Sequence, residues 1–188
     1  MELKEVLKNF VSTFGRDNTD LGKVNFVDQN NVPEDSLDAL YHYLQFDESL
    51  VIGGELYIDI YPKAMQEKIQ EGWYILKDNG QVIYDDVNWN KDWVVFATRH
   101  GDAIYFDRNN GEVCASINKI SFFKLADSLA MFFKILLLGM KIEQKKYDLE
   151  AFDDDEETLP EFIEDVKSIL KETTNNKFKS DFISFFFE

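Results

Sequence analysis

The chain has few of the residues that hold disulfide-bonded or zinc-stabilised proteins together. Its 188 residues include one cysteine, Cys114, and two histidines. A single cysteine excludes an internal disulfide framework, and so few sulfur and imidazole ligands argue against a zinc site. We therefore expect no bound metal and no cofactor. Cys114 lies within a strand-like run, where a small buried thiol is the usual arrangement.

Long hydrophobic segments are also missing. The longest apolar run covers residues 135–140, far fewer than the roughly 20 residues that a membrane-spanning helix needs. The first residues, MELKEVLKNFVSTF, place acids and lysines between apolar positions. Their spacing follows one face of a helix and not the pattern of a signal peptide. The sequence therefore predicts a cytoplasmic protein without membrane contact.

Basic residues are outnumbered by acids. The chain carries 36 aspartates and glutamates against 20 lysines and arginines, which gives a net charge of −16. This charge repels the phosphates of nucleic acids and of anionic membranes, so we expect neither as a partner. A basic protein, by contrast, would be attracted at long range. An equally good explanation is that the acidity serves solubility alone.

Motifs for catalysis and nucleotide binding are absent. The sequence has no Walker loop, no GxGxxG and no GxSxG. An EF-hand-like start at Asp86 fails, because Lys91 stands where glycine is needed and Ala97 where glutamate is needed. His100 and Asp102 flank a glycine and could act as a base and its orienting group, but adjacent turn residues rarely point together. We therefore expect no catalytic residue and no enzymatic activity.

The most informative segment contains three strand-like runs followed by an apolar helix. The runs are residues 92–97, 102–107 and 112–117, and Asn-Asn-Gly at 109–111 suits a tight turn between the last two. The helix is predicted from Leu125 onward and is apolar on most sides, so it needs wide coverage. The residues expected to be buried are Trp93, Phe96, Ile104, Phe106, Leu129, Phe132, Phe133 and Leu136.

This segment resembles the SUKH superfamily, which includes bacterial immunity proteins against polymorphic toxins and fungal regulators of cell-wall synthesis. The resemblance rests on DWVVFA at 92–97, GDAIYFD at 101–107 with GEV at 111–113, and LADSLAMFF at 125–133. It is firm over residues 73–137 and looser over 33–72. It implies a SUKH-like fold.

The rest of the chain indicates a single α+β domain over residues 1–145, with a mainly antiparallel sheet packed by flanking helices. Residues 146–188 are predicted to form an acidic linker and a helical extension packed on the same domain. Further predictions are a helix with Pro33 in its first turn, a surface helix over 62–71 and a hairpin joining 73–76 to 81–84. Thr158 and Glu161 fit a capping box at the start of a helix.

Candidate partner-binding residues are acids and one tryptophan near residues 84–92. They are Asp85, Asp86, Trp89 and Asp92, with Asp102 in a following turn. Aromatic rings edged by charge are typical of protein-recognition hot spots. Trp93 is interpreted as a core residue, and Trp89 is left open between core and surface. The acidic run 153–157 is interpreted first as a solvated linker and second as a docking segment for a basic partner.

The SUKH resemblance implies an immunity protein that binds and blocks a cognate bacterial toxin, often a nuclease. Nucleases bind a polyanion and are commonly basic, so an acidic inhibitor is physically suited to them. The alternative is a scaffold or regulatory protein related to the cell-wall-synthesis branch. The sequence leaves open the toxin, the face that binds it and the oligomeric state.

Overall fold

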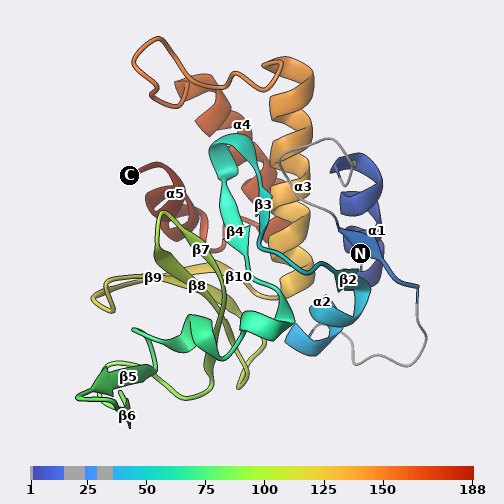
Figure 1. Cartoon of the computed structure of the whole chain (residues 1–188). Helices are drawn as coiled ribbons and strands as arrows, with labels where there is room; N and C mark the ends of the chain where they lie inside the picture. Colours follow the sequence, from blue (N-terminus) through green and yellow to red (C-terminus); the bar gives the residue numbers. More distant parts are fainter. Residues whose placement is uncertain (1, 15–23, 29–35) are drawn as a thin grey trace.

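A six-stranded sheet lies at the centre of the protein (Figure 1). The computed structural model describes residues 2–14, 24–28 and 36–188. The strand order is β10-β9-β8-β7-β4-β3, and every neighbouring pair is antiparallel. The prediction of an α+β fold with a mainly antiparallel sheet is therefore confirmed. The strands are β3 (Leu50–Ile52), β4 (Ile58–Ile60), β7 (Trp93–Arg99), β8 (Asp102–Asp107), β9 (Val113–Ile117) and β10 (Ser121–Ala126).

The three strands predicted over residues 92–117 all form, as β7, β8 and β9. Their alternating side chains divide between two apolar clusters, because successive strand residues point to opposite faces. Phe96 and Ile104 belong to the larger cluster beneath the helices. Val95 and Tyr105 belong to a smaller cluster on the other face. The central strands are thus buried on both sides, as a run rich in β-branched and aromatic residues requires.

A fourth strand, β10, occupies the position where the apolar helix was predicted to begin. Leu125 and Ala126 lie in this strand, which pairs with β9. The helix α3 (Leu129–Lys146) begins only after Ser128, whose hydroxyl oxygen accepts a hydrogen bond from the Met131 N–H at 3.1 Å. Serine is a favoured residue at this capping position, so the strand ends and the helix starts within two residues.

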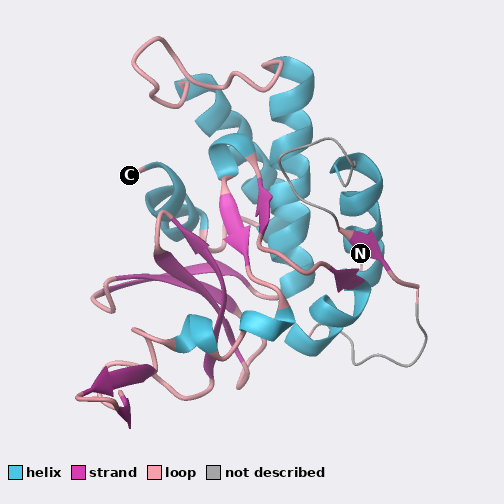
Figure 2. Cartoon of the chain, viewed as in Figure 1, coloured by secondary structure: helices cyan, strands magenta, loops and turns pink. Residues whose placement is uncertain are grey.

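Helix α3 lies against one face of the sheet, with α1 (Leu3–Phe14) and α4 (Pro160–Thr174) beside it (Figure 2). This arrangement covers the helix widely, as its apolar surface demands. All of the residues predicted to be buried are buried except Trp93, which is partly exposed. Phe133 contacts Phe10 and Phe132 edge to face, with ring centroids 6.2 Å and 5.7 Å away.

The segment before the sheet differs in part from prediction. Helix α2 (Leu37–Tyr43) begins after Ser36, and Pro33 lies outside the described residues. The predicted surface helix over 62–71 is wrong, because this segment forms two 3-10 turns, η2 (Lys63–Met65) and η3 (Lys68–Gln70). The Gln70 side-chain amide donates to Val95 O at 2.8 Å and accepts from Val95 N–H at 3.1 Å. This amide continues the ladder of β7 beyond the end of β4 and holds η3 against the sheet.

Shorter elements complete the chain. The predicted hairpin forms with β6 (Gln81–Tyr84) as expected, but its first strand, β5 (Ile75–Asp78), begins two residues later than the predicted 73–76. A 3-10 turn, η1 (Gly54–Leu56), precedes β4, and β1 (Asn25–Phe26) pairs with β2 (Leu44–Gln45). Within the described residues, no helix has the length and apolar character needed to cross a membrane.

The C-terminal helices lie against the rest of the protein. Helix α4 packs on α3, and α5 (Lys179–Phe187) packs on β10, where Asp181 accepts the Lys124 backbone N–H at 3.0 Å. The predicted capping box is wrong. Leu159 occupies the capping position without a side-chain bond, and the Thr158 hydroxyl donates instead to the Glu55 carboxylate. The Thr158 hydroxyl therefore bonds Glu55 of η1, far away in the sequence, and does not cap the start of α4.

Candidate functional site

The sheet face opposite α3 carries a cluster of aromatic side chains. Val95 on β7 and Tyr105 on β8 point to this face, and the segment between β4 and β7 folds over them. Gln70 positions this segment through its two hydrogen bonds to Val95. The cluster therefore joins the sheet to the loop that carries most of the candidate partner-binding residues.

Trp89 is the centre of this cluster. Its side chain is only 2% exposed, and its indole N–H donates to Trp93 O at 3.0 Å. Its ring centroid lies 5.0 Å from Tyr105 and 5.1 Å from Trp73. Trp89 is thus a core residue, whose ring and N–H are already satisfied within the protein and whose side chain is not exposed to a partner.

Trp93 has the more exposed position. It is partly buried, stacks on Tyr105 with a centroid distance of 5.0 Å, and donates its indole N–H to Asp107 Oδ2 at 3.0 Å. Phe122 on β10 lies 5.5 Å from it and is itself exposed. Trp89, which the sequence left open between core and surface, is therefore the buried tryptophan, whereas Trp93, predicted to be a core residue, is partly exposed.

Asp85 is held inside the protein by an ion pair. Its side chain accepts hydrogen bonds from the Asn88 backbone and side-chain N–H groups at 3.1 Å and 2.9 Å. Its other oxygen accepts from Lys119 Nζ at 2.6 Å, and this bond is the main cause that lowers the pKa of Asp85. Asp85 is buried. It is therefore not placed to contact a partner, and instead it fixes the loop 85–92 against the turn between β9 and β10.

The remaining acids fall into two groups. Asp86 is exposed and accepts the Tyr74 hydroxyl at 3.1 Å, and Asp92 is half-buried directly before β7. Asp102 lies at the other end of β8, opposite Arg99, about 17 Å along the strand from Asp107. Asp102 is therefore not part of the surface that Asp86 and Asp92 share, and the five candidate residues do not form one site.

Exposed apolar residues on two neighbouring loops were not singled out from the sequence. Val87 and Ile120 are 91% and 82% exposed, and Tyr84 and Phe122 are also exposed. The Asp85–Lys119 ion pair holds the two loops together. We call these four residues the apolar surface. Three apolar residues in a row at 82–84 were a signal in the sequence, because a strand with one covered face would alternate.

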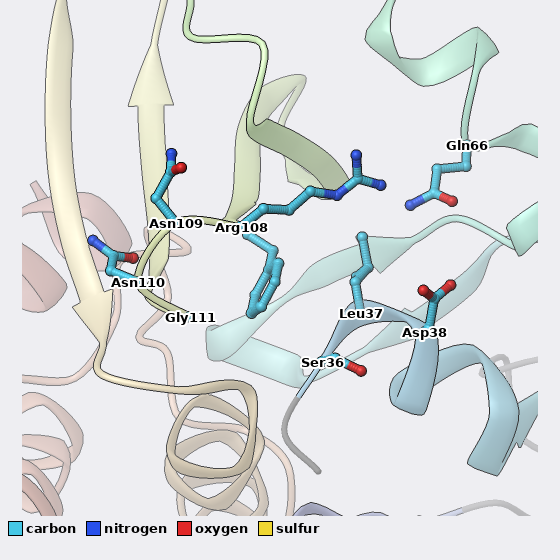
Figure 3. Close-up of a pocket in the computed structure, with 9 residues that line it drawn as sticks. Ser36, Leu37, Asp38, Gln66, Arg108, Asn109, Asn110 and Gly111 are labelled. Carbon is cyan, nitrogen blue, oxygen red and sulfur yellow. The ribbon is translucent and has the colours of Figure 1, made fainter. Parts of the chain in front are cut away.

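Two polar hollows are present among the described residues. One, of about 350 Å³, lies within the loop from Asp86 to Lys91, beside Trp93. The other, of about 400 Å³, lies between the start of α2 and the turn joining β8 to β9. In this second hollow Arg108 reaches toward Gln66, and Asp38 faces the same opening (Figure 3). Ser36 also lines the second hollow, and its hydroxyl oxygen accepts the Ala39 N–H at 3.1 Å at the start of α2.

The described part of the chain contains no group of three or more histidine, cysteine, aspartate or glutamate side chains that could hold a metal ion. His100 lies in the turn before Asp102, where burial raises the carboxyl pKa. Burial raises the pKa of the Cys114 thiol to about 12, so it is a poor nucleophile at neutral pH.

Comparisons with protein-family models, with curated proteins and with solved structures give no match for this chain.

Proposed function

We propose that this chain is a non-enzymatic cytoplasmic protein that binds and neutralises a basic bacterial toxin domain, a nuclease in the first instance. The apolar surface is the observation that carries the proposal. Val87 and Ile120 place branched apolar side chains almost entirely in solvent, on loops that an internal ion pair holds in position. A clustered apolar surface of this kind is a usual mark of a protein-binding site.

Charge supports the same partner class. Asp86 and Asp92 border the apolar surface, and the chain as a whole carries a charge of −16. An apolar centre with a charged rim matches the usual arrangement of a protein interface. The acidic rim attracts a basic partner and repels nucleic acid, so the chain can compete with nucleic acid for the cationic surface of a nuclease. The resemblance to immunity proteins of the SUKH superfamily points to the same function.

A growth-protection assay tests this proposal. A candidate basic toxin domain, chosen from the genes that neighbour the gene for this chain, is expressed in a bacterial host, with and without the chain. We expect the wild-type chain to restore growth and to form a stable complex with an inactivated form of the domain. Val87→Asp combined with Ile120→Asp should abolish both effects, because two charges would be buried at the interface.

The control is Leu149→Asp, which changes another exposed apolar residue, in the loop after α3. It should protect as well as the wild type. If the wild-type chain neither protects nor binds, the proposed function is wrong. If the doubly substituted chain remains folded and still protects, the partner binds elsewhere.

A further inference from the structure

The hairpin β5–β6 projects from the body of the protein and forms a separate two-stranded sheet (Figure 1). Its strands pair from Ile75 opposite Tyr84 to Asp78 opposite Gln81. The two turn residues, Asn79 and Gly80, have φ values of 48° and 79°. Positive φ at both positions belongs to the turn type that suits the twist of a hairpin, so the register of the two strands is well defined.

The hydrogen-bond pattern shows which backbone groups of β6 point outward. Asp85 N–H donates to Tyr74 O at 2.9 Å, which makes these residues a hydrogen-bonded pair. Such pairs alternate with non-bonded pairs along an antiparallel ladder. Val82 and Tyr84 therefore belong to non-bonded pairs, and their N–H and C=O groups point away from β5. By the same alternation, the carbonyl oxygen of Ile75 points outward from β5, and it accepts a hydrogen bond from Gly72 N–H at 2.8 Å.

The outer edge of β6 is open. Within residues 2–14, 24–28 and 36–188, no backbone or side-chain group bonds the outward N–H or C=O of Val82 or Tyr84. Two other edges are bonded at one position each, because Gly72 N–H donates to Ile75 O on β5 and Asp181 accepts Lys124 N–H on β10. Proteins usually protect an edge strand in such ways, so the unprotected edge of β6 needs a different explanation.

The side chains of β6 also suit a partner strand. Val82, Ile83 and Tyr84 are 56%, 45% and 57% exposed. A two-stranded hairpin is only marginally stable by itself, and a third strand would cover apolar side chains on both of its faces. Tyr84 is part of the apolar surface, so the edge and that surface are continuous.

We propose that the outer edge of β6 binds an extended, lysine- or arginine-rich segment of the partner, which pairs with the Val82 and Tyr84 backbone as an added strand. This inference rests on the proposed function for the basic character of the partner. Of the five carboxylates in residues 71–92, Glu71 pairs with Lys77 and Asp85 pairs with Lys119, which leaves Asp78, Asp86 and Asp92 against one further lysine, Lys91. Pairing with a second copy of this chain would bring two such acidic segments together, whereas a basic segment is attracted to them. Strand addition of this kind supplies affinity through main-chain hydrogen bonds.

Amide exchange followed by NMR tests the proposal with a defined probe, a short capped peptide of alternating lysine and valine. The peptide should slow exchange at Val82 and Tyr84 by about tenfold or more at saturation, because both N–H groups become hydrogen-bonded. The same peptide with every backbone nitrogen methylated should not do so, because it can no longer donate main-chain hydrogen bonds from either of its edges.

Two variants separate backbone pairing from side-chain contact. Val82→Pro removes the outward N–H and leaves the inward bonds of the hairpin, and proline is tolerated on an edge strand. Val82→Thr keeps the N–H and the branched shape. We expect Val82→Pro to weaken binding of the peptide and of the inactivated toxin domain about tenfold relative to Val82→Thr.

Equal affinities of the two variants, or exchange that slows elsewhere but not at Val82 and Tyr84, would overturn the edge proposal. Such a result leaves growth protection unaffected, so it is distinct from failure of the proposed function. Conversely, if the peptide slows both amides but the chain gives no protection against the toxin domain, the open edge is a strand-binding site and only the proposed function is wrong.

Discussion

Lys119 Nζ lies 2.6 Å from Asp85 Oδ2 and joins two loops that are 34 residues apart in the sequence. Both side chains are largely buried. The ion pair brings together the loop that carries Val87 and the turn that carries Ile120. The exposed apolar surface therefore depends on a buried polar contact beneath it.

Asp85→Asn should lower the urea midpoint of unfolding more than Asp86→Asn does. The first change leaves Lys119 without its carboxylate, whereas the second removes an exposed charge. Since the pKa of Asp85 is lowered from its usual 3.8, the stabilisation is present above that pH and is lost as the pH falls through the folded-state value. The gap between the two variants should therefore narrow in acid. A gap that does not change with pH would contradict this explanation.

Glu143 on α3 is a buried carboxyl that has no cationic partner among the described residues, and its Oε1 accepts the Glu55 backbone N–H at 3.2 Å. Gly54 leaves room for it, since a Cβ there would overlap the carboxylate. Burial raises the pKa of Glu143 from 4.5 to about 7, and the nearby Glu55 carboxylate adds to the shift. The folded state thus holds a proton that the unfolded state has lost, so stability falls as pH rises between these values.

Glu143→Gln should therefore stabilise the protein at pH 8, by about 1–2 kcal/mol in the free energy of unfolding, and should change it little at pH 5. The glutamine Oε1 keeps the bond from Glu55 N–H. Urea unfolding at both pH values measures the effect, with the exposed Glu161→Gln on α4 as the control. If Glu143→Gln instead destabilises the protein equally at both pH values, the carboxyl group of Glu143 stabilises the fold, and this explanation is wrong.

Phe133→Ala should cost on the order of 3–5 kcal/mol, because it opens a cavity between α1, α3 and the sheet. Phe133 is fully buried and contacts Phe10 and Phe132. Phe122→Ala is the matched control, since Phe122 is 44% exposed and can lose its ring with less cavity formation. Urea unfolding compares the two variants. A folded Phe133→Ala protein with the wild-type urea midpoint would contradict the assignment of Phe133 to the hydrophobic core.

Association with the inactivated toxin domain should slow several-fold between low and high salt, while dissociation changes less. The attraction is screened over a Debye length of about 8 Å at physiological ionic strength. Charge reversal at Asp86 and Asp92 should slow association more than reversal at Asp153, Asp154 and Asp155. Stopped-flow mixing measures these rates. Equal effects of the two acidic groups would contradict the choice of surface, and a salt-independent rate would contradict electrostatic attraction.

The candidate site was predictable only in part. Asp86 and Asp92 have the exposure that a rim residue needs, but Asp85 is paired internally and Asp102 lies at the far end of β8. Nothing in the local sequence distinguishes Asp85 from Asp86. Their difference arises because Lys119 arrives from another hairpin, and this contact depends on how β9 and β10 are placed beside β8.

The sequence by itself determined the elements whose pattern is local. The three β-branched and aromatic runs within 92–117 give β7, β8 and β9, and the spaced apolar residues near the start give α1. The excess of acids is likewise a property of composition. A repeat of two or of 3.6 residues selects strand or helix without any distant contact, so such elements can be read directly.

Only the tertiary structure decided which side chains remained exposed. Both Trp89 and Trp93 suit a buried position, but η3, held by Gln70 against Val95, directs the covering segment over Trp89 and leaves Trp93 at the edge. In the same way, residues 121–126 become a strand because β9 offers a free edge to pair with. Burial and pairing depend on segments far apart in the chain, and a local pattern carries no information about which of them will meet.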